Sequence, residues 1–169
     1  MAGKSFSLQI AEFIAKTKEN VDFTVRETLH KLDEKIVARS PVGDTKKWLS
    51  LRPYSTWKRG KKSGKVKTML KGPAGYVGGR FRSNWQLSVD APATGVLGFV
   101  ATDVAAAIAA HGAVLKGAKA GHIYYLVNNL PYAIPLENGH SKQAPIGMVG
   151  ITVMEFPSIV NEVVAGIKK

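Results

Sequence analysis

Apolar residues recur at helical spacing through the first forty residues of the chain. They follow one another three, four or seven positions apart: Ile10, Ile14, Val21, Val25, Leu29, Leu32 and Ile36. This period predicts one amphipathic helix over residues 7–39, with Ser7 capping its start and Pro41 stopping it. At 1.5 Å per residue the helix would be about 50 Å long. Its apolar stripe is therefore covered either by the sheet of its own subunit or, in part, by a neighbouring subunit.

A two-residue alternation replaces the helical period further along the chain. In residues 80–89 one face would carry Phe81, Ser83, Trp85, Leu87 and Val89. This alternation predicts a half-buried strand, which we expect to form an antiparallel hairpin with a second strand at 96–102. A third strand is predicted at 122–128, and a short extended piece at 132–136. Trp85 is expected to pack in the core.

The remaining helices are placed by capping residues and prolines. Asp103 is expected to cap a short alanine-rich helix at 104–115, and Pro145 to open the last helix. Pro157 lies inside that last helical pattern and should kink or split it. The predicted fold class is α+β: a small antiparallel sheet, a long N-terminal helix and a C-terminal helix, plus a long basic loop or arm. One domain would span residues 1–169, with residues 43–79 as the inserted arm.

Charge singles out this arm. The chain has 24 Lys and Arg against 12 Asp and Glu, and residues 45–89 contain twelve of the basic residues and no acidic one. Such asymmetry indicates contact with a polyanion or an acidic partner. The candidate contact residues are the basic side chains interleaved with Tyr54 and Trp57: Lys58, Arg59, Lys61, Lys62, Lys65 and Lys67. The alternative is a solvated loop whose lysines only aid solubility.

The sequence offers little for catalysis, metals or cofactors. Cysteine is absent, which excludes disulfides and thiol chemistry. Glu137 and His140 have a spacing that could bind a metal on a helix, but Asn138 and Gly139 indicate a turn there, and no second such pair exists. We expect no enzyme, no cofactor and no metal. The longest nearly apolar run, 104–115, is too short for a membrane span.

Two separated blocks resemble one protein family. Residues 122–156 include YYLVNNLPYAIPLENGHSKQAPIGMV at 124–149, and this passage resembles the neck and tail-completion proteins of long-tailed bacteriophages. Ser40-Pro41-Val42 and the GRFRSNW segment at 79–85 resemble two halves of a family motif, roughly SPVDTGRFRSNW, which the arm would interrupt here. Asp44-Thr45 are present, but the motif's following glycine is Lys46.

The resemblance implies a structural virion protein at the head–tail junction. It would form a homo-oligomeric ring, six-fold or twelve-fold, that joins the portal connector to the tail and leaves a lumen for DNA. It implies neighbouring head-closure and tail-terminator or tail-tube proteins as partners, possible DNA contact in the lumen, no membrane, and synthesis in the host cytoplasm. The subunit-interface candidates lie on or beside the corner after the third strand: Asn129, Pro131, Tyr132, Glu137, His140 and Gln143. Glu137 would either anchor the turn or pair with a basic residue of the next subunit.

Two other functions are considered from the residues alone. One is a cytoplasmic protein that binds nucleic acid through the basic arm without sequence preference, since no RRM, zinc-finger or basic-zipper signature is present. The other is a small hydrolase, which the lack of a converging acid, base and nucleophile argues against.

Overall fold

A single long helix is the axis of the molecule. The computed structural model describes residues 5–44, 51–58, 61–69 and 77–167. In chain order its elements are α1 (Phe6–Arg39), β1 (Leu51–Lys58), β2 (Lys61–Met69), η1 (Arg82–Asn84), β3 (Trp85–Val89), α3 (Val104–Ile108), η2 (Ala109–His111), α4 (Gly112–Gly117), β4 (Tyr124–Asn128), α5 (Ala133–Glu137), α6 (Val149–Met154) and α7 (Phe156–Ala165). The α+β class is confirmed: a long N-terminal helix, a two-stranded antiparallel sheet and C-terminal helices.

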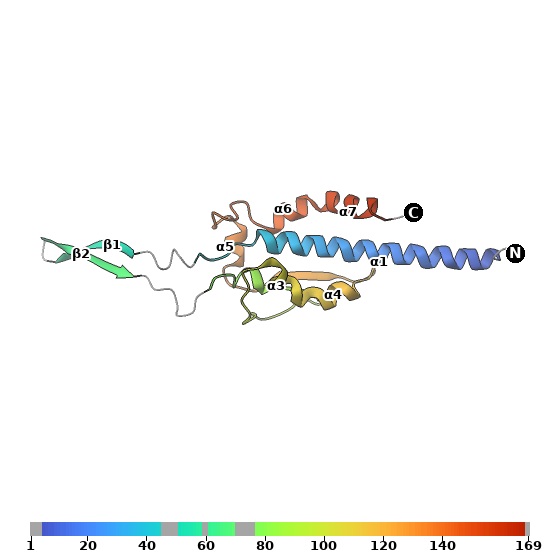
Figure 1. Cartoon of the computed structure of the whole chain (residues 1–169), viewed down its shortest axis with the longest axis horizontal. Coiled ribbons are helices and arrows are strands. Elements are labelled where there is room, and N and C mark those ends of the chain that lie inside the picture. Colours follow the sequence, from blue (N-terminus) through green and yellow to red (C-terminus); the bar gives the residue numbers. More distant parts are fainter. Residues whose placement is uncertain (1–4, 45–50, 59–60, 70–76, 168–169) are drawn as a thin grey trace.

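The predicted first helix is present almost as expected. It ends at Arg39, and Ser40 is extended (φ −67°, ψ 130°) in front of Pro41. The predicted cap is wrong, because Ser5 rather than Ser7 precedes the helix and it makes no side-chain capping bond. α6 and α7 lie along one side of α1, and α3, α4 and the β3–β4 sheet lie along the other (Figure 1).

The predicted strand at 80–89 is only half right. β3 covers Trp85–Val89, whereas residues 82–84 form the 3-10 turn η1. Two buried polar side chains explain the turn. The Ser83 hydroxyl has its hydrogen within reach of the carbonyl oxygens of Phe99 (2.9 Å) and Gly79 (3.1 Å), and Asn84 Nδ2 donates to Arg80 O (2.9 Å). Such local bonds give the backbone an alternative to a ladder.

The expected hairpin with residues 96–102 is also wrong. That segment has no strand, and β3 instead pairs with β4, in the register Trp85↔Asn128 to Val89↔Tyr124. The Asn84 side chain takes the place of a strand partner for Leu97. It accepts from Leu97 N–H at 2.8 Å and donates to Leu97 O at 3.2 Å. The backbone polar groups of Leu97 are thereby satisfied without a ladder.

In the C-terminal half, the secondary structure differs from the prediction near Pro135 and Pro145. The extended piece predicted at 132–136 is wrong, since Ala133–Glu137 form α5 and Pro135 occupies a first-turn position that needs no N–H donor. Pro145 does not open the last helix, because α6 begins at Val149. The split at Pro157 is confirmed: α6 ends at Met154, and the proline lies at the start of α7.

The core joins α1 to the residues around the sheet. Its members are buried apolar side chains from widely separated parts of the sequence: Ile36, Val37, Phe81, Trp85, Ala101, Ala107, Leu130, Ala144 and Met148. Trp85 is buried as predicted, with its ring edge-on to Phe81 at 6.0 Å between centroids.

The arm leaves the body where two glycines meet. Gly78 has φ +73°, and a Cβ there would overlap the carbonyl oxygen of Gly43, so only glycine fits this close approach. Within the arm β1 and β2 form an antiparallel hairpin, in the register Leu51↔Met69 to Lys58↔Lys61, at the end of the molecule opposite the N-terminus (Figure 1). This part of the sequence has no strand period, so the hairpin was not predicted.

Candidate assembly surfaces

The two halves of the interrupted motif are in contact. Trp85 Nε1 donates to the Ser40 hydroxyl at 2.7 Å, and this hydroxyl donates to Ile36 O at 2.8 Å. The Arg82 guanidinium donates to the carbonyl oxygens of Ala38 (3.0 Å) and Ser40 (2.9 Å). These carbonyls lie at the negative end of α1, where a cation is stabilising. The motif residues on both sides of the arm therefore build one corner of the body.

A buried ion pair holds this corner to η2, the turn that ends at His111. His111 Nδ1 lies 2.7 Å from Asp33 Oδ2, and His111 Nε2 lies 2.8 Å from the carbonyl oxygen of Trp85. The Trp85 carbonyl and an ionised Asp33 are both acceptors, so the protonated imidazole is the form that can donate to both. Burial alone would lower the pKa of His111, but the hydrogen bond and charge of Asp33 and the Trp85 carbonyl raise it above the ordinary value. No catalytic role follows, because both side chains are buried.

Glu137 anchors the turn, which is one of the two roles expected for it from the sequence. Its carboxylate accepts backbone N–H bonds from Met148 (2.9 Å), Val149 (3.0 Å) and Gly150 (2.9 Å). Burial would raise the pKa of Glu137, but these three bonds lower it below the ordinary value. The carboxylate thus closes the 138–147 loop onto the start of α6.

Two further interface candidates are bonded within the chain. The Gln143 side chain accepts from Val42 N–H at 3.0 Å and donates to Val42 O at 2.8 Å, which ties the loop to the root of the arm. Asn129 Nδ2 donates to Ala93 O at 3.0 Å.

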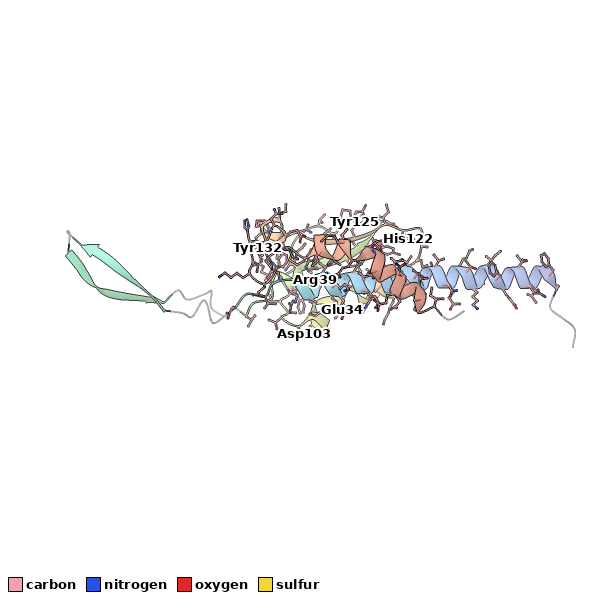
Figure 2. The ribbon with its side chains drawn as sticks, turned by 90° about the horizontal axis from the view of Figure 1, so that it is seen from above. Glu34, Arg39, Asp103, His122, Tyr125 and Tyr132 are labelled. Atoms are coloured by element: carbon pink, nitrogen blue, oxygen red, sulfur yellow. The ribbon has the colours of Figure 1, made fainter. Side chains whose placement is uncertain are left out.

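The other three candidates are exposed. Pro131, Tyr132 and His140 lie on the surface, and Tyr132 is labelled at the edge of the body in Figure 2. The centroid of the Tyr132 ring lies 6.0 Å from that of Phe81, and the side chain is 41% exposed. Sequence reasoning missed Ile134 and Ile146, which are 75% and 67% exposed. If residues 132–136 had been predicted as a helix, Ile134 would have been expected on the exposed face of that helix.

The basic candidates fall on the hairpin. Lys58 pairs with Lys61 in the β1–β2 register, Trp57 with Lys62, Ser55 with Lys65 and Pro53 with Lys67. Arg59 lies outside the described residues. The other five candidates therefore belong to a two-stranded element, and among the described residues β1 and β2 form a sheet of two strands.

The N-terminal part of α1 is uncovered. Residues 6–19, called the tip here, are all exposed, including Phe6 (78%) and Phe13 (68%). At the N-terminal end of the molecule, the tip extends beyond every other labelled element in Figure 1. In Figure 2 its side chains project from a helix that no other described element covers. Ile10, Ile14 and Val21, expected in the buried stripe, are 44%, 48% and 45% exposed. An apolar face of the tip is therefore left in contact with solvent.

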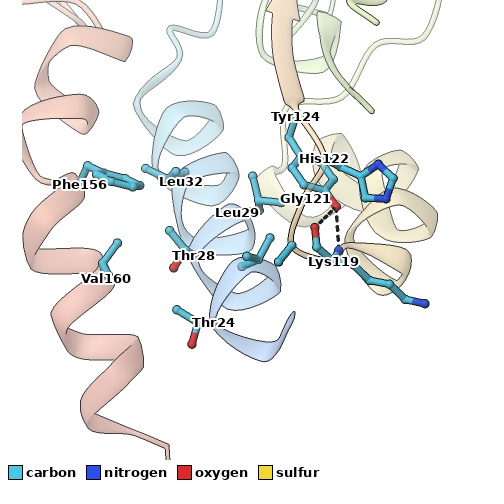
Figure 3. A pocket seen from close by; sticks show the side chains of 12 residues that line it. Thr24, Thr28, Leu29, Leu32, Lys119, Gly121, His122, Tyr124, Phe156 and Val160 are labelled. Carbon is cyan, nitrogen blue, oxygen red and sulfur yellow. Dashed lines mark hydrogen bonds between the residues drawn. The ribbon is translucent and has the colours of Figure 1, made fainter. Parts of the chain in front are cut away.

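A groove begins where the tip ends. Two adjoining hollows of about 380 and 390 Å³ lie along α1 and share Lys119 and Ala120. The first is bounded by α1, by α7 through Phe156 and Val160, and by the turn before β4 (Figure 3). The second continues along α1 past Val21 to Thr17.

One buried polar atom faces this groove without a bond. Thr28 lines the groove and is 7% exposed, and its Oγ1 has no hydrogen-bond partner in the described part of the chain. The preceding helical threonines return their hydroxyls to carbonyl oxygens, Thr24 to Asn20 and Thr17 to Phe13, both at 2.8 Å. An unpaired buried hydroxyl is unfavourable, so Thr28 is a point of local cost in the part of α1 beneath the groove.

Comparisons with known proteins add no assignment: no protein-family model, no curated protein and no solved structure matches the chain. Within the described ranges, none of the helices has both the length and the apolar content to cross a membrane. Among those same residues, no three His, Asp or Glu side chains gather as metal ligands.

Proposed function

We propose that this protein is a subunit of a ring at the head–tail junction of a long-tailed bacteriophage. Subunits would lock side by side, six or twelve to a ring, join the portal connector to the tail, and leave a lumen for DNA. The proposal rests on the resemblance of residues 122–156 and of the interrupted motif to neck and tail-completion proteins.

One structural observation carries this proposal furthest. The motif halves are separated in the sequence by residues 43–78, yet they meet through Trp85–Ser40 and Arg82–Ser40 hydrogen bonds of 2.7 and 2.9 Å. Their adjacency supports reading them as one motif opened by an insertion. The exposed tip and the exposed Tyr132 and Ile134 are the kind of surface that assembly requires.

Deletion of the gene tests the proposal. Without this subunit, electron microscopy should find separate filled heads and tails, or joints that break on purification. Mass spectrometry of purified wild-type particles should find the protein in six or twelve copies per particle. Normal joined particles from the deletion strain would refute the proposal.

The concentration of charge in the hairpin favours one alternative, a free protein that binds nucleic acid through β1 and β2. Binding would be independent of sequence and would weaken steeply with salt, because neutralised phosphates release their counterions. The free protein should then retain single- or double-stranded DNA at low salt, and the deletion strain should assemble normal particles. Salt-insensitive binding, or none, would exclude this alternative.

A further inference from the structure

The exposed tip and the groove belong to one face of α1. Phe6, Ile10, Phe13, Thr17, Val21, Thr24 and Thr28 follow one another at spacings of three or four residues, which aligns them on one side of a helix. From Phe6 to Phe13 this face is bare. From Thr17 onward it forms the floor of the groove, and Lys119, Ala120 and α7 form the walls. One apolar surface is thus open at its start and walled at its end.

The composition of the tip matches what the groove can accept. Phe6, Ile10, Phe13 and Ile14 are apolar and at least 44% exposed. The first hollow is lined mostly by apolar and uncharged side chains together with Lys119 and His122, and the second adds Lys18 and Asp22. An apolar helix face fits such a wall, whereas a polyanion would meet the carboxylate of Asp22 beside the two lysines. Nor can a chain fill its own groove, because its tip continues away from the groove in the same helix (Figure 1).

We propose that the groove is the docking site for the tip of a second copy of this chain. Each subunit would present a tip to one neighbour and a groove to the same or another neighbour. Docking in the groove would bury the apolar face of the incoming tip, a short helical segment whose apolar side chains would otherwise stay in water.

This inference rests on the self-association that is part of the proposed function. It does not require the protein to be a component of the virion. Two phenylalanines at the exposure of Phe6 and Phe13 supply on the order of 200–300 Å² of buried area. A stable interface buries about 800 Å² per partner. The tip alone is therefore too small, and we expect the groove walls, including Phe156 at 45% exposure and Ile123 at 62%, to be covered as well.

Cross-linking tests the contact directly, since the chain has no cysteine of its own. Subunits that carry Ile10→Cys are mixed with subunits that carry Ala120→Cys and treated with a bis-maleimide, which tolerates some variation in distance. Both positions are exposed, so both variants should fold. Mixed dimers should form, and each variant alone should give none. The matched control is Leu8→Cys mixed with Ala120→Cys, because Leu8 is exposed on the opposite side of the tip.

The doubly substituted chain, with both cysteines, reports the arrangement. Products that stop at two subunits mean that tips and grooves pair reciprocally, which supports this inference and removes support from the ring. A ladder of larger products supports both. Cross-linking in the mixture no higher than in the Leu8→Cys control overturns the inference. So does efficient cross-linking of Ile10→Cys subunits to one another, which would mean that tips pair with tips.

Sedimentation of full-length variants gives an independent readout. Phe13→Asp should weaken association roughly thirtyfold or more, as expected for a buried aromatic anchor. Leu8→Asp should leave it unchanged. Equal association of both variants overturns the inference, even where particles are shown to contain the protein. Conversely, normal particles from a deletion strain would end the virion role and leave a confirmed tip–groove contact standing.

Discussion

The two ends of α1 have similar apolar periods and opposite surroundings. The C-terminal part is held by α6 and α7 on one side and by the sheet and α3–α4 on the other, with Val37 fully buried. The tip has no such cover, and Phe6 and Phe13 are mostly exposed. The period alone reports that a helix has an apolar face. What covers that face depends on residues far away in the sequence or in another molecule.

Polar contacts distinguish the two ends further. Lys31 pairs with Glu162 at 2.8 Å, and Arg39 pairs with Glu155 at 2.6 Å. Arg39 also donates to Thr152 at 2.7 Å, so the covered part is fixed to both α6 and α7. Its buried centre is the Asp33–His111 pair. Equivalent substitutions in the two ends of α1 therefore test how far the surroundings of each end determine its stability.

The largest effect is expected at the buried ion pair. Asp33→Ala should lower the free energy of unfolding by about 3–5 kcal/mol, because the imidazolium of His111 would remain buried without its partner. Urea unfolding of the free subunit measures this. Glu34→Ala, the exposed neighbour, is the control and should change stability by less than about 0.5 kcal/mol. Equal effects of the two substitutions would show that the pair does not hold the corner.

Matched isoleucines test the comparison itself. Ile36→Ala should lower the free energy of unfolding by about 2–5 kcal/mol, because Ile36 is 7% exposed and its loss leaves a cavity. Ile14→Ala should change it by less than about 0.5 kcal/mol in the free subunit, because Ile14 is 48% exposed. Denaturation at low protein concentration separates folding from association. A large loss at Ile14 in the monomer would mean that the tip is covered within its own subunit.

The pH dependence of stability should follow His111. Its folded pKa is raised, so its contribution is fully present below the unfolded pKa of about 6.5 and is lost as pH rises through the folded pKa. Stability should therefore fall with a slope of at most about 1.4 kcal/mol per pH unit in that window. Urea unfolding from pH 6 upward, compared with His111→Gln, measures the slope. An identical slope in the variant would assign the titration to another group.

The sequence predicts an element well where one strong local signal decides it. The helical period and Pro41 placed α1, and Pro157 placed the break between α6 and α7. The alternation at 80–89 failed because Ser83 and Asn84 use their side chains to bond the backbone of residues 79–80 and 97–99. That choice depends on tertiary neighbours, which an alternation pattern does not report.

The candidate surfaces were predicted less completely than the fold. Exposed Tyr132 and the anchoring Glu137 could be singled out, because a proline corner and an Asn-Gly turn mark an irregular loop. The Asp33–His111 pair was missed, since 78 residues separate its partners and no local pattern connects them. The groove was missed for the same reason, because α1, α7 and the turn before β4 come together only in the folded chain.

The smallest effect is expected from glycine in the tip. Glu34→Gly, compared with Glu34→Ala, should lower the free energy of unfolding by about 1 kcal/mol, because the helix there melts only with the whole subunit. Ala15→Gly should leave that free energy nearly unchanged in the monomer and reduce the helical circular dichroism instead, since an uncovered helix end opens locally before global unfolding. In the associated protein, the same substitution should weaken association, because the docked tip must then be helical. If Ala15→Gly destabilises the dilute monomer as much as Glu34→Gly does, the tip folds and unfolds with the body, and the contrast between the two ends of α1 is one of exposure alone.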